Sequence, residues 1–241
     1  YGKLAQPYTL PSSSVDATVA VQHPLAMLHY ALEECIGFRM FVFTECYRMR
    51  TPTAATPWRI ASYADEVGHN PVGRDKRKCQ AIYWSFMEYG SRALETEQCW
   101  FELSAIRSKV VDTMNGGMSR LFKLLLLDLF HKDPFDIALG ALLPGGMMLY
   151  AKFACLVADG AALKQILNAK GASGFKFCPI HFEVCDHKKS EERMSACIPG
   201  TSLDFDSMQR NTDESVQAIV RELKLMHARW TRGEITKEAY D

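Results

Sequence analysis

Two stretches of sequence decide the fold: Trp58–Asp65, which reads WRIASYAD, and Met147–Gly160, which reads MMLYAKFACLVADG. Each is an apolar run of strand length that reaches an aspartate and then a loop or turn. This is typical of a buried strand and the residues that follow it. We therefore expect two buried strands, each ending immediately before its aspartate, Asp65 in the first and Asp159 in the second.

The residues between these stretches predict two more strands and one helix. Lys78–Tyr89 is rich in aromatic and β-branched residues, and Cys99–Ile106 has a similar strand-like character. Met118–His131 is strongly apolar and is stopped by Asp133-Pro134, as expected of a buried helix. Short turns favour antiparallel pairing of the first three strands. The longer connection through the helix suits a crossover that brings the fourth strand parallel to the first.

The expected third strand shows a regular alternation of side chains, which suits a strand with one wet face. One face would carry Trp100, Glu102 and Ser104, and the other Phe101, Leu103 and Ala105. The large aromatic side chains of the second and third strands are expected in the core, namely Trp84, Phe86 and Trp100.

This order of elements is that of an RNase H-like α/β domain, with a mixed sheet of three antiparallel strands, a helix and a fourth parallel strand, flanking helices and a Cys/His-rich insertion. At the start, residues 1–20 predict a loop or linker, whereas 24–50 predict a helix from apolar residues at helical spacing: Leu25, Leu28, Leu32, Ile36 and Met40. The expected limits are 1–54 for the linker and helix, 55–175 for a partial catalytic core, 176–200 for the Cys/His insertion and 201–241 for a helical segment.

Asp65 and Asp159 are the candidate catalytic residues. In an RNase H-like sheet the first and fourth strands are neighbours, so their ends would bring the two carboxylates close together. Two such acids repel unless cations lie between them, and a hard divalent ion such as Mg²⁺ is the usual solution. Two magnesium ions about 3.5–4 Å apart can activate a water or a DNA 3′-hydroxyl and stabilise the leaving oxygen.

Each aspartate also has a structural interpretation. An Asp after a strand is commonly a turn residue or a helix cap, and Asp159 would serve as the N-cap of a helix at Ala161–Ala169. A slip of one residue would exchange Asp65 for Glu66 at the strand end. Two acids at matching strand ends nevertheless favour the metal site over two separate structural roles.

Three of the eight Cys residues crowd into one short window with two His residues. The CxxH spacing at the start of this window allows two ligands in a tight turn to bind one ion. Further Cys and His residues could complete a tetrahedral zinc site. Such a site would stabilise a loop that has few apolar residues. Free thiols and surface His residues are the alternative. The zinc candidates are Cys178, His181, Cys185, His187 and Cys197.

Basic residues gather near both aspartates, although Lys and Arg number 28, Asp and Glu number 28, and the net charge is zero. A nucleic-acid protein often carries a basic surplus, so the overall balance counts mildly against one. Flexible basic turns can contact phosphates without reading sequence, and solvated loops are the alternative. The candidate nucleic-acid contacts are Arg74, Lys76, Lys78, Lys170 and Lys176.

Two segments resemble eukaryotic DDE transposases of the Plavaka and Kyakuja–Dileera–Zisupton kind. Leu156–Cys178, which reads LVADGAALKQILNAKGASGFKFC, is similar to their second-aspartate region, and Arg59–Tyr89 is similar to their first-aspartate region. The resemblance implies magnesium-dependent DNA strand cleavage and transfer, transposon ends and target DNA as partners, and work in the nucleus. Self-association into a homo-oligomer stays open.

The sequence departs from that family at two points. His181 stands where the family has the second Cys of its Cys-x-x-Cys. The third carboxylate of a DDE triad cannot be assigned here, because an exposed amphipathic helix at Asp213–Glu238 explains the acids of the last segment better; these are Glu214, Glu222 and Glu234. We expect the chain to be a piece of a longer protein, with that carboxylate beyond Asp241.

Three functions are therefore compatible with the sequence. The first is an active transposase, the second is a domesticated or decayed transposase that binds nucleic acid without cutting it, and the third is an unrelated α/β scaffold with a zinc-stabilised loop. Membrane insertion is not expected, because Lys123, Asp128 and Lys152 interrupt the longest apolar runs. The start shows no signal peptide, so we expect an intracellular protein that is not secreted.

Overall fold

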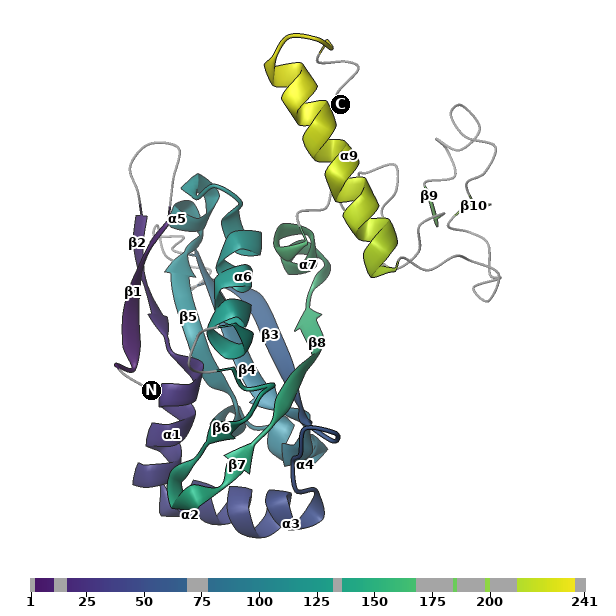
Figure 1. The fold of residues 1–241 in the computed structure, drawn as a ribbon. Helices are drawn as coiled ribbons and strands as arrows, with labels where there is room; N and C mark the ends of the chain where they lie inside the picture. Colours follow the sequence, from purple (N-terminus) through teal and green to yellow (C-terminus); the bar gives the residue numbers. More distant parts are fainter. Residues whose placement is uncertain are drawn as a thin grey trace. The chain divides into compact units, whose positions relative to one another are not determined.

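A computed structural model describes residues 3–10, 17–68, 78–131, 136–167, 184–185, 198–199 and 212–236. The chain divides into two compact units, Tyr1–Asn168 and Ala169–Asp241. The first unit contains the four-stranded sheet and its helices, and the second contains one long helix and a short strand pair (Figure 1).

The centre of the first unit is a mixed sheet with the strand order β5-β4-β3-β8. β3 pairs antiparallel with β4, β4 pairs antiparallel with β5, and β8 lies parallel to β3. This confirms the expected sheet of three antiparallel strands with a parallel fourth. The strands are β3 Trp58–Gly68, β4 Lys78–Phe86, β5 Phe101–Arg107 and β8 Ala151–Ala158.

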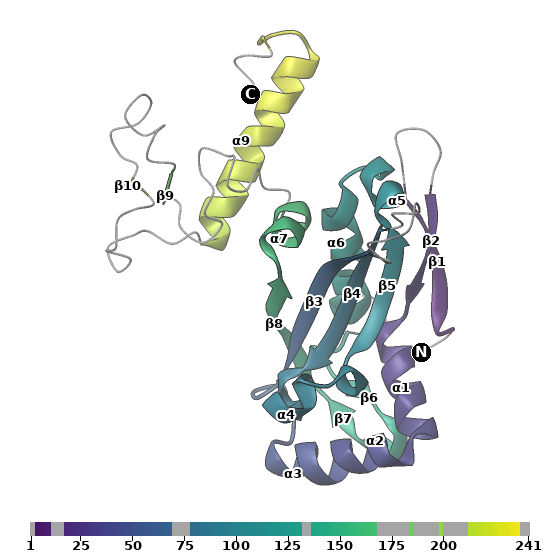
Figure 2. The ribbon, with the colours of Figure 1, turned by 180° about the vertical axis from the view of Figure 1, so that it is seen from behind.

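One face of this sheet carries the core. Alternate side chains of β3 point to that face, where Trp58, Ile60 and Ala64 have no exposed surface. The helix α6 (Gly117–Phe130) covers it, and the opposite face of β3, β4 and β5 is seen in front of α6 when the molecule is turned (Figure 2). Residues of α6 at helical spacing complete the core, and they are Met118, Leu121, Leu125 and Leu129.

The start of the chain is not a linker, which corrects the prediction for residues 1–20. β1 (Ala5–Leu10) and β2 (Ala17–Gln22) form an antiparallel hairpin, and β2 lies against β5. Val19 and Val21 are buried, because alternate residues of β2 face the core. Their neighbours are small or polar, so the alternation of buried and exposed residues along β2 is not evident from the sequence.

The predicted helix at 24–50 is broken. α1 (Pro24–Glu34) begins at the N-cap His23, whose Nδ1 accepts a hydrogen bond from the Ala26 amide at 3.2 Å, and it ends at Cys35 in an extended conformation. The chain changes direction there, so Ile36 and Met40 do not continue the row of buried side chains on α1. They are 66% and 54% exposed. The helical pieces that follow are α2 Ile36–Met40, η1 Phe41–Cys46 and α3 Tyr47–Met49.

The remaining connections are short. The strand predicted at 147–158 is divided at Tyr150, because its first part pairs with another short strand and only β8 joins the central sheet. The expectation of a buried strand was wrong for β8, which lies at the edge of the sheet and has mostly exposed or half-buried side chains. The helix predicted at 161–169 is α7 (Gly160–Ile166). The other short elements are η2 Met87–Tyr89, α4 Ser91–Leu94, η3 Glu97–Cys99, α5 Ser108–Thr113, β6 Ala141–Leu142, η4 Pro144–Gly146 and β7 Met148–Leu149.

In the second unit, α9 spans Asp213–Thr231 and does not continue to Glu238 as predicted. Its N-terminus is a capping box in which Thr212 and Ser215 exchange hydrogen bonds. Several apolar side chains of α9 are exposed, as expected of a surface helix; among them are Val216, Val220 and Leu223. The strand pair is β9 Val184–Cys185 with β10 Ile198–Pro199.

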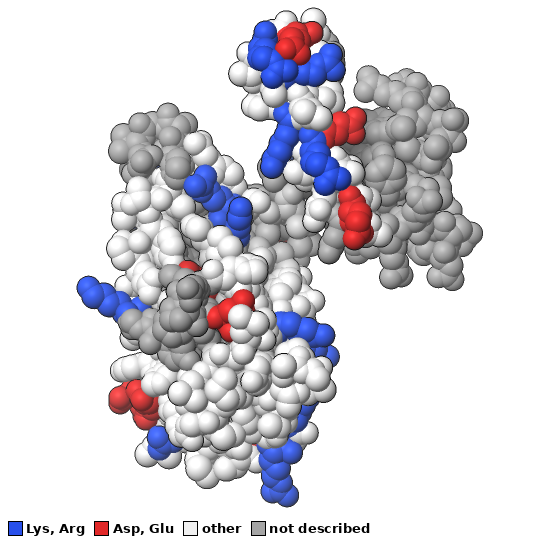
Figure 3. Space-filling view, in the orientation of Figure 1, with Lys and Arg blue, Asp and Glu red and all other residues white. Residues whose placement is uncertain are grey.

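The surface of the first unit carries no strong charge pattern on the face seen in Figure 3, where the acidic and basic side chains of the described residues are spread singly. None of the helices in the described ranges is both long and apolar enough to cross a membrane.

The thiols of Cys46 and Cys35 lie in different environments. Burial, reinforced by nearby negative charge, raises the pKa of the Cys46 thiol to about 12, whereas Cys35 is exposed. Only the thiolate reacts, so iodoacetamide at pH 8 should alkylate Cys35 at least about a hundredfold faster than Cys46 in the folded protein. Site-resolved mass spectrometry measures both rates, and denaturant should remove the difference. Comparable rates without denaturant would show that Cys46 is not buried.

Candidate metal site and sheet-face groove

The structure places Asp65 inside β3 and not at its end, which corrects the predicted strand boundary. β3 continues to Gly68 because its residues still pair with β4, and Asp65 stands opposite Ala81. Side chains two apart on a strand share a face, so Asp65 lies on the same side as Tyr63, away from the fully buried Ala64. Asp65 therefore faces the side of the sheet that α6 does not cover.

Asp159 follows the last residue of β8 and begins α7. Its backbone is still extended, and its Oδ1 accepts a hydrogen bond from the Ala162 amide at 2.7 Å. The predicted role as an N-cap is therefore confirmed.

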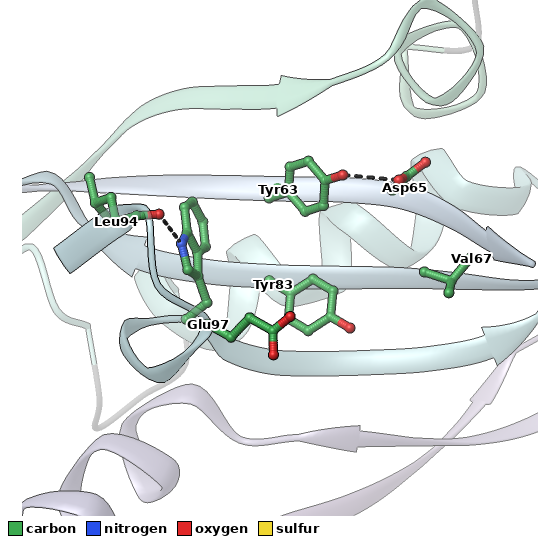
Figure 4. A pocket seen from close by; sticks show the side chains of 7 residues that line it. Tyr63, Asp65, Val67, Tyr83, Leu94 and Glu97 are labelled. Atoms are coloured by element: carbon green, nitrogen blue, oxygen red, sulfur yellow. Dashed lines mark hydrogen bonds between the residues drawn. The ribbon is translucent and has the colours of Figure 1, made fainter. Parts of the chain in front are cut away.

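β3 and β8 bring the two aspartates together. The parallel register between these strands ends with Ala64 opposite Ala158, so Asp65 and Asp159 are the residues that directly follow this last pair. The Tyr63 hydroxyl donates to Asp65 Oδ2 at 2.9 Å (Figure 4). This hydrogen bond, then partial burial and the charges of Asp65 and Asp159, raise the pKa of Tyr63. Both carboxylates therefore act on the same phenol.

Glu66, the alternative to Asp65 if the strand slipped by one residue, belongs to the other face. Its carboxylate accepts hydrogen bonds from Lys78 Nζ at 2.6 Å and from the Ser108 hydroxyl at 2.8 Å. The Lys78 hydrogen bond is the main reason that the pKa of Glu66 is lowered. Lys78, expected to contact nucleic acid, is thus engaged with Glu66 at the start of β4, with its side chain 56% exposed.

The donor set at Asp65 and Asp159 suits a hard cation. One oxygen of each carboxylate is engaged by Tyr63 or by Ala162, and the second oxygen has no hydrogen-bond partner among the described residues. Oxygen ligands of this kind are those that Mg²⁺ prefers. Within the described ranges no three His, Cys, Asp or Glu residues gather into a metal-binding group, so the pair alone forms the candidate site.

Most of the other predicted site residues lie outside the described part of the chain. This applies to the zinc candidates Cys178, His181, His187 and Cys197, and for Cys185 only the backbone in β9 is described. It applies equally to four of the candidate nucleic-acid contacts, which are Arg74, Lys76, Lys170 and Lys176.

A groove of about 520 Å³ opens on the sheet face that Asp65 shares. Two sets of side chains form it: those of β3 and β4 on the uncovered face, and those of the segment that includes α4 and η3. The Ser85 hydroxyl holds this segment on β4 by donating to the Cys99 carbonyl at 2.6 Å. The lining residues are Tyr63, Asp65, Val67, Tyr83, Leu94, Glu97 and Trp100 (Figure 4).

Sequence reasoning missed this groove. Trp84 and Phe86 are fully buried as predicted, but Trp100 is partly exposed and lines the groove instead of the core. A register shift opposite Ile82 and Tyr83 disturbs the predicted alternation on β5, so Leu103 and Ser104 are both buried. The two tyrosines of the groove are paired across β3 and β4, and this match becomes visible only when the register of the strands is known.

Comparison with known proteins assigns the chain to no family. No protein-family model matches it, and no curated protein matches it significantly. The resemblance around Asp65 and Asp159 therefore carries no assignment by itself, and the geometry of the described residues has to support any function.

Proposed function

We propose that the chain is part of a DDE-type DNA transposase with an RNase H-like core, in which Asp65 and Asp159 hold catalytic Mg²⁺ for DNA strand cleavage and transfer. The observation that carries the proposal is the parallel pairing of β3 and β8, whose register leads into the two aspartates. The strand order and the crossover through α5 and α6 are those expected of such a core.

The protein's own residues would prepare the site in two ways. Tyr63 orients the Asp65 carboxylate through its 2.9 Å hydrogen bond, and the first turn of α7 fixes Asp159 through the Ala162 amide. Bound magnesium would supply a stronger nucleophile and stabilise the leaving oxygen. Both carboxylates are thus held before any substrate arrives, which limits the loss of side-chain freedom on binding.

The remaining parts of the proposal follow from the same family. DNA would be the partner, the basic residues near the aspartates would contact its phosphates, and the Cys/His cluster at 178–197 would bind zinc. The protein would work in the nucleus, and the third carboxylate would come from a residue that the described ranges do not gather with the pair.

Magnesium binding tests the proposal directly. Calorimetric titration of the whole chain should show Mg²⁺ binding that Asp65→Asn and Asp159→Asn each weaken at least about tenfold, because each removes one anionic oxygen ligand. Mg²⁺ is the better probe than Zn²⁺, because thiolates and imidazoles of the Cys/His cluster do not suit it.

Glu66→Gln is the matched control. It removes a carboxylate from the adjacent position of β3, but one that faces Lys78 and Ser108. Its Mg²⁺ affinity should stay within about threefold of that of the unchanged chain, because Glu66 acts on Asp159 through its charge alone and Lys78 already pairs with that charge. Equal affinities in the unchanged chain and both Asn variants, or a loss in Glu66→Gln alone, would remove the catalytic assignment.

A further inference from the structure

The groove beside Asp65 offers aromatic surfaces at several angles. The ring centroids of Tyr63 and Tyr83 are 6.3 Å apart with a tilt of 36°, and those of Tyr63 and Trp100 are 6.2 Å apart with the rings at 65°. Trp100 is held in place because its indole N–H donates to the Leu94 carbonyl at 2.9 Å. With its N–H satisfied, the indole presents its apolar ring to a ligand.

Negative charge surrounds these rings. Asp65 and Glu97 line the groove, and no Lys, Arg or His is among its lining residues. Burial, followed by the charges of Glu102 and Glu97, raises the pKa of Tyr83. Three π faces combined with carboxylates attract a cation, since a ring face and a carboxylate both carry negative potential.

We propose that this groove binds the guanidinium group of an arginine side chain presented by a partner polypeptide, stacked on one of the rings of Tyr63, Tyr83 and Trp100, in contact with the others and paired with Glu97. This goes beyond DNA cleavage and does not depend on it. The groove volume of about 520 Å³ lies within the range of ligand sites.

The shape of the groove favours a side chain over a free small molecule. A small ligand usually buries most of its surface in a closed site. Here Tyr63, Tyr83 and Trp100 are all partly exposed, and Glu97 is exposed, so the groove is open to solvent along one side. A side chain tethered to a second backbone can use such an open groove, because the rest of the polypeptide continues over the surface.

Arginine suits the groove better than lysine. A guanidinium is planar, stacks on aromatic rings, loses its hydration more easily than an ammonium and presents several N–H donors to a carboxylate. An ammonium is more strongly hydrated and has no flat face to stack on a ring.

The experiment uses the whole chain and three blocked tripeptides without divalent metal: acetyl-Gly-Arg-Gly-amide, its lysine counterpart and its citrulline counterpart, which is nearly isosteric and uncharged. Nuclear magnetic resonance follows the indole N–H signal of Trp100, assigned with a Trp100→Phe variant. The arginine peptide should cause a saturable shift, with at least about fivefold weaker binding of the citrulline peptide. Tetramethylammonium serves as the free organic cation.

Variants of the groove separate its parts. Tyr83→Leu should weaken arginine-peptide binding at least about fivefold by removing one ring face. Glu97→Gln should weaken it about two- to fivefold, as expected for a solvent-exposed pair. Glu95→Gln is the matched control, because Glu95 is an exposed acid close in sequence that does not line the groove, and its affinity should be unchanged.

Tyr83→Leu also separates this proposal from the magnesium site, because it leaves Asp65 and Asp159 in place. Loss of arginine binding with intact Mg²⁺ binding supports a recognition site that adjoins the magnesium site at Asp65 but does not require it. Three results would overturn the proposal: no saturable shift, equal binding of the arginine and citrulline peptides, or binding of the lysine peptide or tetramethylammonium as tight as that of the arginine peptide.

Discussion

Trp58→Ala should lower the free energy of unfolding of the first unit by about 3–5 kcal/mol, the range for truncating a large aromatic side chain in a core. Trp58 has no exposed surface and starts β3, where it pairs with Ala151 of β8. Its removal would leave a cavity that the rigid sheet can only partly close.

The contacts of Trp58 explain why the effect should be large. Its ring centroid lies 4.9 Å from that of Tyr47 and 5.3 Å from that of Phe86, both at steep angles that favour edge-to-face packing. Its indole N–H donates to the Arg50 carbonyl at 2.7 Å. The side chain thus joins the helical segment before β3 to the sheet, and the Ala variant would lose this connection as well as the packing.

Chemical denaturation followed by far-ultraviolet circular dichroism measures the change without relying on tryptophan fluorescence. Trp58→Phe keeps an aromatic ring but loses the indole hydrogen bond, so it should cost only about 1–2 kcal/mol. Trp230→Ala is the composition-matched control, because Trp230 lies on α9 and is 38% exposed. A loss below about 1 kcal/mol in Trp58→Ala would place this residue outside a tightly packed core.

The sheet could be predicted because its strands are apolar runs that end at recognisable turn or loop residues. Trp58–Ala64 stands out because it forms a central strand that is buried for much of its length. The run before Asp159 is equally apolar, although β8 is an edge strand with mostly exposed or half-buried side chains. Parallel pairing of β3 and β8 followed from the long helical connection between them, which leaves little choice of topology. The closeness of Asp65 and Asp159 therefore depended on chain connectivity more than on either residue.

Other features could not be predicted, because they arise from pairing between distant segments. β3 continues past Asp65 only because β4 offers partners as far as Lys78. The register shift that buries both Leu103 and Ser104 depends on how β5 meets β4, and neither strand shows it alone. The groove is a consequence of the same pairing, because Tyr63 and Tyr83 face each other across the two strands.

The N-terminal hairpin shows a different limit. Its sequence is rich in small and polar residues, so its strands have few apolar positions to mark them. Tyr8 donates from its hydroxyl to Asp128 Oδ1 at 2.6 Å, which connects β1 to the buried side of α6. A buried acid within an apolar helix was visible in the sequence, but its partner lies 120 residues away. Local patterns carry no information about such a pair.

Asp65→Asn and Asp159→Asn should each reduce Mg²⁺-dependent nicking of supercoiled plasmid DNA at least about a hundredfold, if the proposed transposase function holds. Replacing groups that only support metal ligands already costs about 10- to 100-fold, so a ligand should cost at least the upper value. Asn keeps the size of the side chain and one oxygen, but it removes the charge that would hold two cations close together.

The choice of Asn separates catalysis from structure. Asn is as good an N-cap as Asp, so Asp159→Asn should preserve the hydrogen bond to Ala162 and leave the melting temperature within about 2 °C. Asp159→Ala would instead remove the cap at a cost of about 1 kcal/mol, which mixes the two effects. At position 65, the Asn carbonyl can still accept the Tyr63 hydroxyl.

Agarose-gel electrophoresis of the relaxed and linear products gives the initial rates, with a chelator as the metal-free reference and Glu66→Gln as the charge control from the other face of β3. Rates that are unaffected by the chelator, or equal in the unchanged chain and both Asn variants, would contradict a metal pair at these aspartates. If Asp159→Asn also unfolded α7, the loss of nicking would be explained by the capping role of Asp159 alone. Lost nicking with unchanged melting would instead assign its charge to the reaction.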